Sequence, residues 1–157
     1  MLTRLRRIAV AIVLLCVCFM AGCAVAPVVT REMDARGRSF TVAEGKANIY
    51  LYRNENLSAS PMQIFVNGAE AGATRRATYL LWEVDPGAYD ISSGSDNTSS
   101  VRIVAEAGKS YYVWQMVKLD RRLVLLDIVI ARSELHIVDE DVGRWGVSEC
   151  SRVQSKL

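Results

Sequence analysis

Residues 79–91, YLLWEVDPGAYDI, decide the fold class of this chain. The central Asp85-Pro86-Gly87 places proline at the second turn position and glycine at the third, as a type II turn requires. On both sides of this turn, large apolar residues occupy every second position: Leu80, Trp82, Val84, Tyr89 and Ile91. A period of two is typical of a half-buried strand. The stretch therefore predicts two strands separated by a turn.

The same alternation recurs on either side of this stretch. It predicts further strands at residues 47–52, 62–66 and 101–106, and a last short strand at 135–137. Residues 111–117 and 123–131 are apolar on both faces and rich in β-branched or aromatic residues, which favours central strands. Asn67-Gly68 is a strong hairpin signal, and Leu119 to Arg122 is expected to link the two long strands. These features predict an all-β fold, a single antiparallel β-sandwich of about seven or eight strands over residues 46–150.

The flanking segments carry weaker patterns. Residues 23–45 hold only scattered apolar side chains, so we expect a flexible tether of about twenty residues, able to reach about 70 Å. Residues 139–150 show helical spacing, but Gly143 and Gly146 each cost a helix about 1 kcal/mol. A short C-terminal helix or an irregular cover is expected there, followed by a disordered tail at residues 151–157.

The N-terminus predicts export. Arginines precede fourteen apolar residues, Ile8 to Ala21, and Met20-Ala21-Gly22-Cys23 resembles the lipobox of bacterial lipoproteins. The apolar run is shorter than the roughly 20 residues that a transmembrane helix needs. Cleavage after Ala26 is an alternative, but Pro27 would then follow the cut, where proline is unfavourable. We therefore expect residues 1–22 to be a signal peptide and Cys23 to carry lipid such as palmitate.

Lipidation of Cys23 has consequences for charge and location. In the lipoproteins that this signal resembles, alanine after the cysteine, here Ala24, points to the outer membrane, so a periplasm-facing position is expected. Removal of residues 1–22 takes three of the 19 basic residues and no acidic one, leaving 16 basic and 17 acidic residues. No nucleic-acid partner is expected from this balance. The pairs Arg75-Arg76 and Arg121-Arg122 are interpreted as solvated charges of turns or edges.

Several turn and core motifs resemble a known family. They are Val66-Asn67-Gly68 with Gly72, residues 84–91, and Ala107-Gly108-Lys109-Ser110-Tyr111-Tyr112. Together they resemble short proteobacterial lipoproteins that are classed only as a domain of unknown function. The Pro-Gly-x-Tyr segment also looks like PEGA-type β domains, which are envelope modules. The resemblance covers about residues 46–140 and implies an envelope-anchored β-sandwich. It implies no catalytic residues and no cofactor.

The sequence gives only weak signals for a catalytic or metal site. His136 is the only histidine, and although Ser133 or Ser148 could accompany it, no G-x-S-x-G nucleophile elbow is present. Residues 139–141, Asp-Glu-Asp, offer oxygen ligands without a following calcium-loop pattern. We therefore expect no enzyme activity, no metal and no cofactor, with a histidine-dependent hydrolase as the least favoured reading. Cys150 is left without an intrachain partner, so it is either a buried thiol or an intermolecular disulfide.

Aromatic residues offer the better binding candidates. Trp82 and Trp114 are expected in the core, whereas Tyr50 and Tyr52 face away from Ile49 and Leu51. The tyrosine pair is therefore predicted to face outward or toward a second layer, as a binding surface. The leading hypothesis is a non-enzymatic lipoprotein of the envelope that binds or supports another envelope component. The alternative is a module that binds glycan or peptidoglycan.

Overall fold

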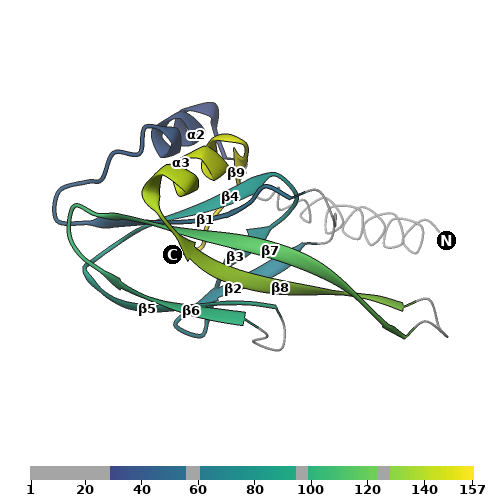
Figure 1. The fold of residues 1–157 in the computed structure, drawn as a ribbon. Coiled ribbons are helices and arrows are strands. Elements are labelled where there is room, and N and C mark those ends of the chain that lie inside the picture. The colour runs from purple at the N-terminus through teal and green to yellow at the C-terminus, as the bar shows by residue number, and fades with distance from the viewer. Residues whose placement is uncertain (1–28, 56–60, 95–98, 124–127) are drawn as a thin grey trace, which may run out of the picture.

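The computed structural model describes residues 29–55, 61–94, 99–123 and 128–157. Within these ranges the chain forms two helices and nine strands. They are α2 (Arg31–Arg38), β1 (Ala47–Arg53), β2 (Met62–Val66), β3 (Ala69–Thr74), β4 (Thr78–Val84), β5 (Gly87–Ser93), β6 (Ser99–Ala105), β7 (Ser110–Leu123), β8 (Ile128–Val138), α3 (Glu140–Ser148) and β9 (Ser151–Arg152). The strands form two layers and the helices lie together outside one of them (Figure 1). The predicted all-β sandwich is confirmed.

One sheet has five strands and the other has four. The five-stranded sheet has the order β8-β7-β1-β4-β9, and the four-stranded sheet has the order β3-β2-β5-β6. Most neighbours are antiparallel, but β1 runs parallel to β7, with Tyr52 opposite Trp114, and β4 runs parallel to β9. Strand β1 is therefore central, held by β4 on one side and by the much later β7 on the other.

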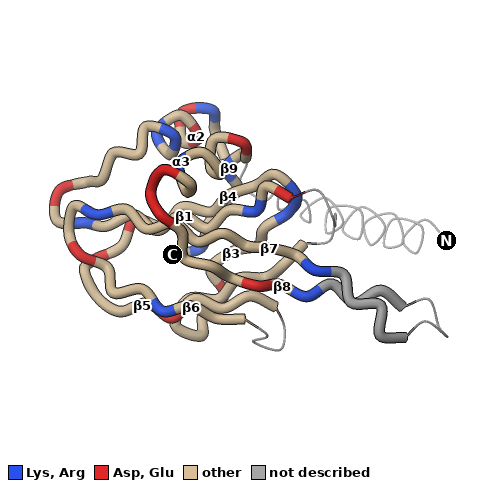
Figure 2. Tube along the Cα trace, in the orientation of Figure 1, with Lys and Arg blue, Asp and Glu red and all other residues tan. Residues whose placement is uncertain are grey.

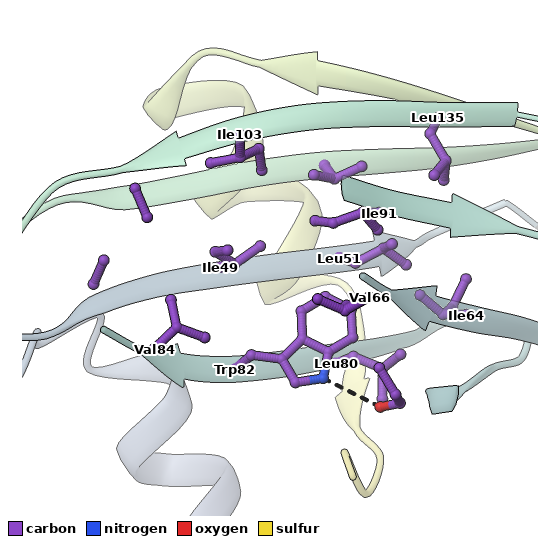
Figure 3. Packing of buried hydrophobic residues seen from close by; sticks show 14 residues of the cluster. Ile49, Leu51, Ile64, Val66, Leu80, Trp82, Val84, Ile91, Ile103 and Leu135 are labelled. Carbon is purple, nitrogen blue, oxygen red and sulfur yellow. Dashed lines mark hydrogen bonds between the residues drawn. The ribbon is translucent and has the colours of Figure 1, made fainter. Parts of the chain in front are cut away.

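The hydrophobic core lies between the inner faces of the two sheets (Figure 3). Ile49 and Leu51 of β1 meet Ile64 and Ile91 of the opposite sheet, and all four are at most 1 % exposed. Trp82 is buried among them as predicted, and its indole N–H donates to the Ala71 carbonyl oxygen at 3.1 Å. The inward positions are every second residue of each strand, which is why the alternation in the sequence predicts the sandwich.

Two predicted turns have different outcomes. Asn67 and Gly68 adopt φ of 51° and 81° and join β2 to β3 as the expected hairpin. The segment Asp85-Pro86-Gly87 separates two strands as predicted, but these strands, β4 and β5, belong to different sheets. Gly87 opens β5 with a φ of 158°, which residues other than glycine rarely adopt and which differs from the φ near +80° at the third position of a type II turn. This segment therefore carries the chain from one layer to the other.

The predicted link at Leu119 to Arg122 is wrong in position. These residues belong to β7, which pairs with β8 as far as Asp120 opposite Ile130 and again at Leu123 opposite Ile128, with a register shift between the two. Residues 124–127, between the two strands, lie outside the described residues. Strand β8 also joins the end of the apolar run at 123–131 to the predicted short strand at 135–137. Both strands are therefore longer than the sequence pattern predicted.

The flanking segments are more ordered than predicted. Residues 31–38 form α2 instead of a tether, and the Thr30 hydroxyl caps it by accepting from the Met33 N–H at 3.2 Å. The expected disordered tail contributes β9, and Ser155 bridges to Gly72. The expected short helix at the C-terminal end is present as α3. No helix among the described residues has the length and apolar character needed to cross a membrane.

Candidate functional site

The outer face of the five-stranded sheet carries a cluster of tyrosines beneath the helices. Tyr50 and Tyr52 of β1, Tyr79 of β4 and Tyr112 of β7 point away from the core, and α2 and α3 cover them. Tyr50 is 0 % exposed and Tyr52 is 2 % exposed. The prediction that these two residues form an accessible binding surface is therefore wrong. Of the two orientations that alternation allows, they take the one toward a second layer.

The tyrosine rings pack against one another and against Phe40. The rings of Tyr50 and Tyr112 are stacked, with centroids 5.1 Å apart and 11° between their planes. Phe40 lies 5.5 Å from Tyr50, and the Arg144 guanidinium lies 4.9 Å from the Phe40 ring centre. The Tyr50 hydroxyl donates to the Gly37 carbonyl oxygen of α2 at 3.0 Å. The cluster is a second core that fixes both helices to the sheet.

Helix α3 approaches the sheet through its two glycines. A Cβ atom at Gly143 would overlap the Tyr112 side chain, and one at Gly146 would overlap the Tyr52 ring. Val142 and Trp145, two of the residues that give this segment its helical spacing, are 51 % and 62 % exposed. The buried face of α3 consists of the glycines and Val147. Sequence reasoning counted these glycines against a helix, whereas they are what allows it to pack.

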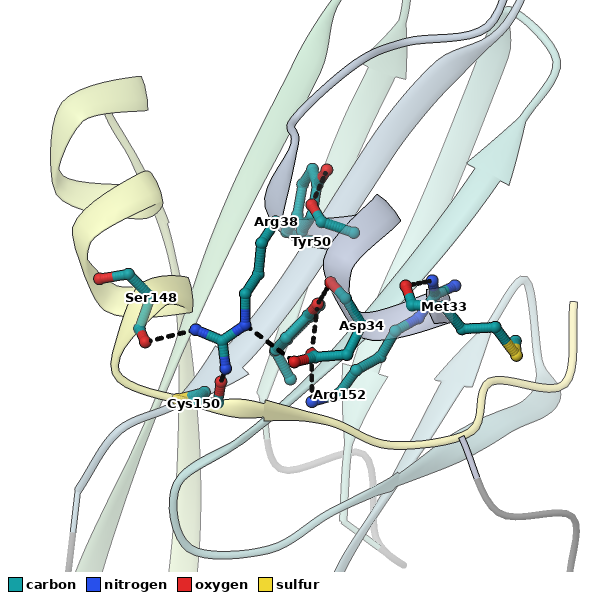
Figure 4. Close-up of polar contacts among 9 residues, drawn as sticks. Met33, Asp34, Arg38, Tyr50, Ser148, Cys150 and Arg152 are labelled. Carbon is teal, nitrogen blue, oxygen red and sulfur yellow. Dashed lines mark hydrogen bonds and ion pairs between the residues drawn. The ribbon is translucent and has the colours of Figure 1, made fainter. Parts of the chain in front are cut away.

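A polar clasp joins α2 to the C-terminal elements (Figure 4). The Asp34 carboxylate accepts from Arg38 Nε at 2.9 Å, from the Tyr79 hydroxyl at 2.9 Å and from the Arg152 N–H at 3.0 Å. The Arg38 guanidinium also donates to the carbonyl oxygens of Ser148 at 2.8 Å and Cys150 at 2.5 Å. Two residues one helical turn apart thus connect α2 with β4, β9 and the end of α3.

Burial raises the pKa of the tyrosines and of the thiol under the helices. Desolvation raises the pKa of Tyr50 and of Tyr52 to about 12, and it raises the pKa of the Cys150 thiol to about 12. Burial also acts to raise the pKa of Asp34, but its hydrogen bonds from Arg38, Tyr79 and Arg152 outweigh this and leave the pKa lowered. The site therefore offers a stable carboxylate and buried neutral hydroxyls, which suit a structural joint.

A second polar group lies between the sheets, where sequence reasoning expected only apolar contacts. Gln115 Nε2 donates to Ser93 Oγ at 2.7 Å and to Ser133 Oγ at 2.9 Å, and Gln115 Oε1 accepts from the Thr74 hydroxyl. All four residues are at most 3 % exposed. The available signal was a glutamine at an inward position of an otherwise apolar strand. The network joins β3, β5, β7 and β8 at the end of the sandwich where β1 finishes.

His136 lies apart from both groups. It is exposed on β8, with its ring 5.8 Å from the Trp114 ring and its Nε2 3.6 Å from a Glu134 oxygen. Ser133 is buried on the inner face of β8, and the Ser148 hydroxyl donates to the Trp145 carbonyl oxygen within α3. The structure therefore does not bring His136 together with either of the two serines considered with it.

Two further predictions concern the acidic residues 139–141 and Trp114, which was expected in the core. Asp139 is the N-cap residue of α3, and Glu140 pairs with Arg144 at 2.6 Å. Within the described ranges, no three His, Cys, Asp or Glu side chains are grouped so that they could hold a metal ion. Trp114 is half-buried on the outer face, and its indole N–H donates to Asn54 Oδ1 at 3.1 Å. Cys23 lies outside the described residues.

Comparison with known proteins identifies one family. No curated protein matches the chain, and no solved structure matches it. The family described as "Protein of unknown function (DUF2846)" matches residues 43–125, a range that runs from the approach to β1 through β7. Helices α2 and α3 and the strands β8 and β9 lie outside the matched range. Because the match covers more than half of the 157 residues, the chain belongs to this DUF2846 family of proteins of unknown function.

Proposed function

We propose that this protein is a non-enzymatic lipoprotein of the bacterial envelope, anchored through lipid on Cys23 and facing the periplasm from the outer membrane. Its β-sandwich binds or supports another envelope component. The observation that carries the proposal is the apolar run of fourteen residues from Ile8 to Ala21, whose last two residues form Met-Ala-Gly-Cys with Gly22 and Cys23. A basic N-terminal segment precedes this run.

The position of the folded domain supports an anchor that acts at short range. Helix α2 starts at Arg31 and is capped by Thr30, so only eight residues run from Cys23 through Thr30. Full extension of eight residues spans at most about 29 Å. The reach of about 70 Å expected for a twenty-residue tether is therefore too long. The domain contacts partners at or near the membrane surface that carries it.

The buried tyrosines weigh against the glycan-binding alternative in its predicted form. A sugar-binding platform needs aromatic faces that a ligand can reach, and Tyr50 and Tyr52 are covered by α3 and α2. Trp145 is the large aromatic side chain that the structure exposes, at 62 %, but a single exposed ring offers no platform. The envelope-binding proposal does not depend on these residues.

Substitution of Cys23 tests the proposal. In the native host, the wild-type protein should float with outer-membrane vesicles and yield an N-terminal Cys23 peptide that carries acyl chains. The variant Cys23→Ser should lose the lipid and remain unprocessed or be released. The variant Cys150→Ser, which removes a buried thiol, is the matched control and should fractionate like wild type. Wild-type protein in the soluble fraction with an unmodified N-terminus would contradict the proposal.

A further inference from the structure

The described charges are distributed unequally between the two ends of the sandwich. At the end where β1 finishes and β7 and β8 continue outward, four exposed cationic residues accompany two carboxylates. The cations are Arg75, Arg76, Lys118 and Arg132, and the carboxylates are Glu55 and Glu134. Arg53 lies at the same end but is 0 % exposed. Figure 2 shows several blue segments at this end, including those where β7 and β8 leave the sandwich. We call it the basic end.

The opposite end has the reverse balance. Among the described residues in its connections and at the start of α3, six carboxylates accompany three cations. The carboxylates are Glu44, Asp85, Glu106, Asp139, Glu140 and Asp141, and the cations are Lys46, Lys109 and Arg144. The three cations are all paired, with Asp85, Glu106 and Glu140 respectively. This acidic end therefore presents surplus negative charge, and the molecule is electrically polar along its strands.

The register places the cations of the basic end together. Arg53 lies opposite Thr78, which follows the exposed pair Arg75-Arg76 in the connection to β4. Tyr52 lies opposite Trp114, so β7 passes the end of β1 as it runs on to Lys118. Lys118 lies opposite Arg132, and both are exposed. Lys118 pairs with Glu134 at 2.8 Å, whereas the Arg75-Arg76 pair lies in the connection to β4.

We propose that the basic end of the sandwich faces the bilayer that holds the lipid on Cys23 and binds anionic phospholipid headgroups. This inference rests on the proposed function. An anchor at most about 29 Å from Thr30 keeps the domain within contact range of the bilayer. Basic residues near an anionic lipid surface are attracted to it, and carboxylates are repelled, so both ends favour the same orientation. The acidic end then points away from the membrane.

Energy transfer in reconstituted vesicles tests the orientation. The mature lipidated protein carries a donor dye on Ser100→Cys, an exposed site of β6 at the basic end, or on Ala107→Cys, an exposed site just after β6 at the acidic end. The acceptor is a headgroup-labelled lipid. Vesicles contain phosphatidylcholine alone or phosphatidylcholine with one third phosphatidylglycerol. Cys150 is buried and takes no dye in the folded protein.

With phosphatidylglycerol, transfer from residue 100 should exceed transfer from residue 107, and high salt should abolish the difference. The double variant R75E/R76E should abolish it as well. The control K46E/K109E makes the same change in net charge at the acidic end and should preserve it. Equal transfer from both sites, or greater transfer from residue 107, overturns the inference.

The same preparation separates failure of the inference from failure of the anchor. If the protein floats with both kinds of vesicle but shows no preferred orientation, only the inference that the basic end faces the membrane is overturned. Protein that floats with neither kind, and whose Cys23 peptide carries no lipid, overturns the proposed function and this inference with it.

Discussion

Single glycines determine how the helical layer sits on the sheet. At Gly143 and Gly146 the backbone of α3 rests directly on the rings of Tyr112 and Tyr52. Local propensity alone ranks glycine as unfavourable in a helix. Here the absence of a side chain allows close packing against large aromatic residues. The same two residues therefore destabilise the isolated helix and stabilise its contact with the sheet.

We predict that Gly146→Ala destabilises the protein. Alanine gains at most about 1 kcal/mol of helix propensity, whereas overpacking against Tyr52 costs about 1–3 kcal/mol. The free energy of unfolding in urea should fall by about 1–2 kcal/mol. The control Val142→Ala changes an exposed position of the same helix and should remain within about 0.5 kcal/mol of wild type. A Gly146→Ala protein as stable as wild type would contradict the packing described.

Asp34 gives the clasp a pH dependence. Its folded pKa is lowered, so its contribution is present above the unfolded carboxyl pKa near 4 and is lost as the pH falls through the folded value. Wild type should be about 1–2 kcal/mol more stable than Asp34→Asn at pH 7. This difference should shrink as the pH is lowered below about 4. Urea unfolding at several pH values measures it, and a difference that grows in acid would refute the assignment.

At the scale of elements, most strands and helix α3 were predictable, whereas helix α2 and the packing of both helices on the tyrosines were not. Each strand has one face in the core, so residues such as Ile49 and Leu51 leave a period of two in the sequence. Helix α2 is held by polar contacts between distant residues, for example Arg38 with the Ser148 carbonyl oxygen, 110 positions away. No local pattern contains such a partner. The tyrosine cluster was missed as a core for the same reason, since its covering layer comes from both ends of the described chain.

Loss of the Arg38 side chain should release α2. The variant Arg38→Ala removes donors to Asp34, Ser148 and Cys150, and amide hydrogen exchange in residues 31–38 should accelerate by about tenfold or more. Arg36→Ala is the matched control. Arg36 is 74 % exposed in its pair with Glu83, so its loss should change exchange little. Similar exchange in both variants would argue against the clasp.

Across the whole molecule, the C-terminal segment closes the gap between the two sheets. Strand β9 extends the five-stranded sheet, while Ser155 bridges to Gly72 and the Lys156 N–H donates to the Ala71 carbonyl oxygen at 3.0 Å. Strand β3 is the edge of the four-stranded sheet, so the segment covers hydrogen-bonding groups of an open edge.

Deletion of residues 153–157 should therefore destabilise the protein by about 2–4 kcal/mol, because several hydrogen bonds between the segment and both sheets are lost. The exposed edge should also increase aggregation on heating. Deletion of Leu157 alone, which is 59 % exposed, is the control and should have little effect. Thermal unfolding followed by light scattering compares the three proteins. If the truncated protein melts and scatters like wild type, the C-terminal segment does not contribute to the stability of the fold.

The parallel pairing of β1 with β7 bears on how the chain acquires its structure over time. Tyr52 meets Trp114 only after the intervening strands have crossed to the other layer and returned. Pairings between residues so distant in sequence slow folding, because the entropy of closing a long loop is lost before the contact compensates for it. Refolding from urea should accordingly take milliseconds to seconds. During synthesis, β1 stays without its later neighbour until most of the polypeptide has emerged, and in this interval its unpaired edge and apolar side chains favour aggregation.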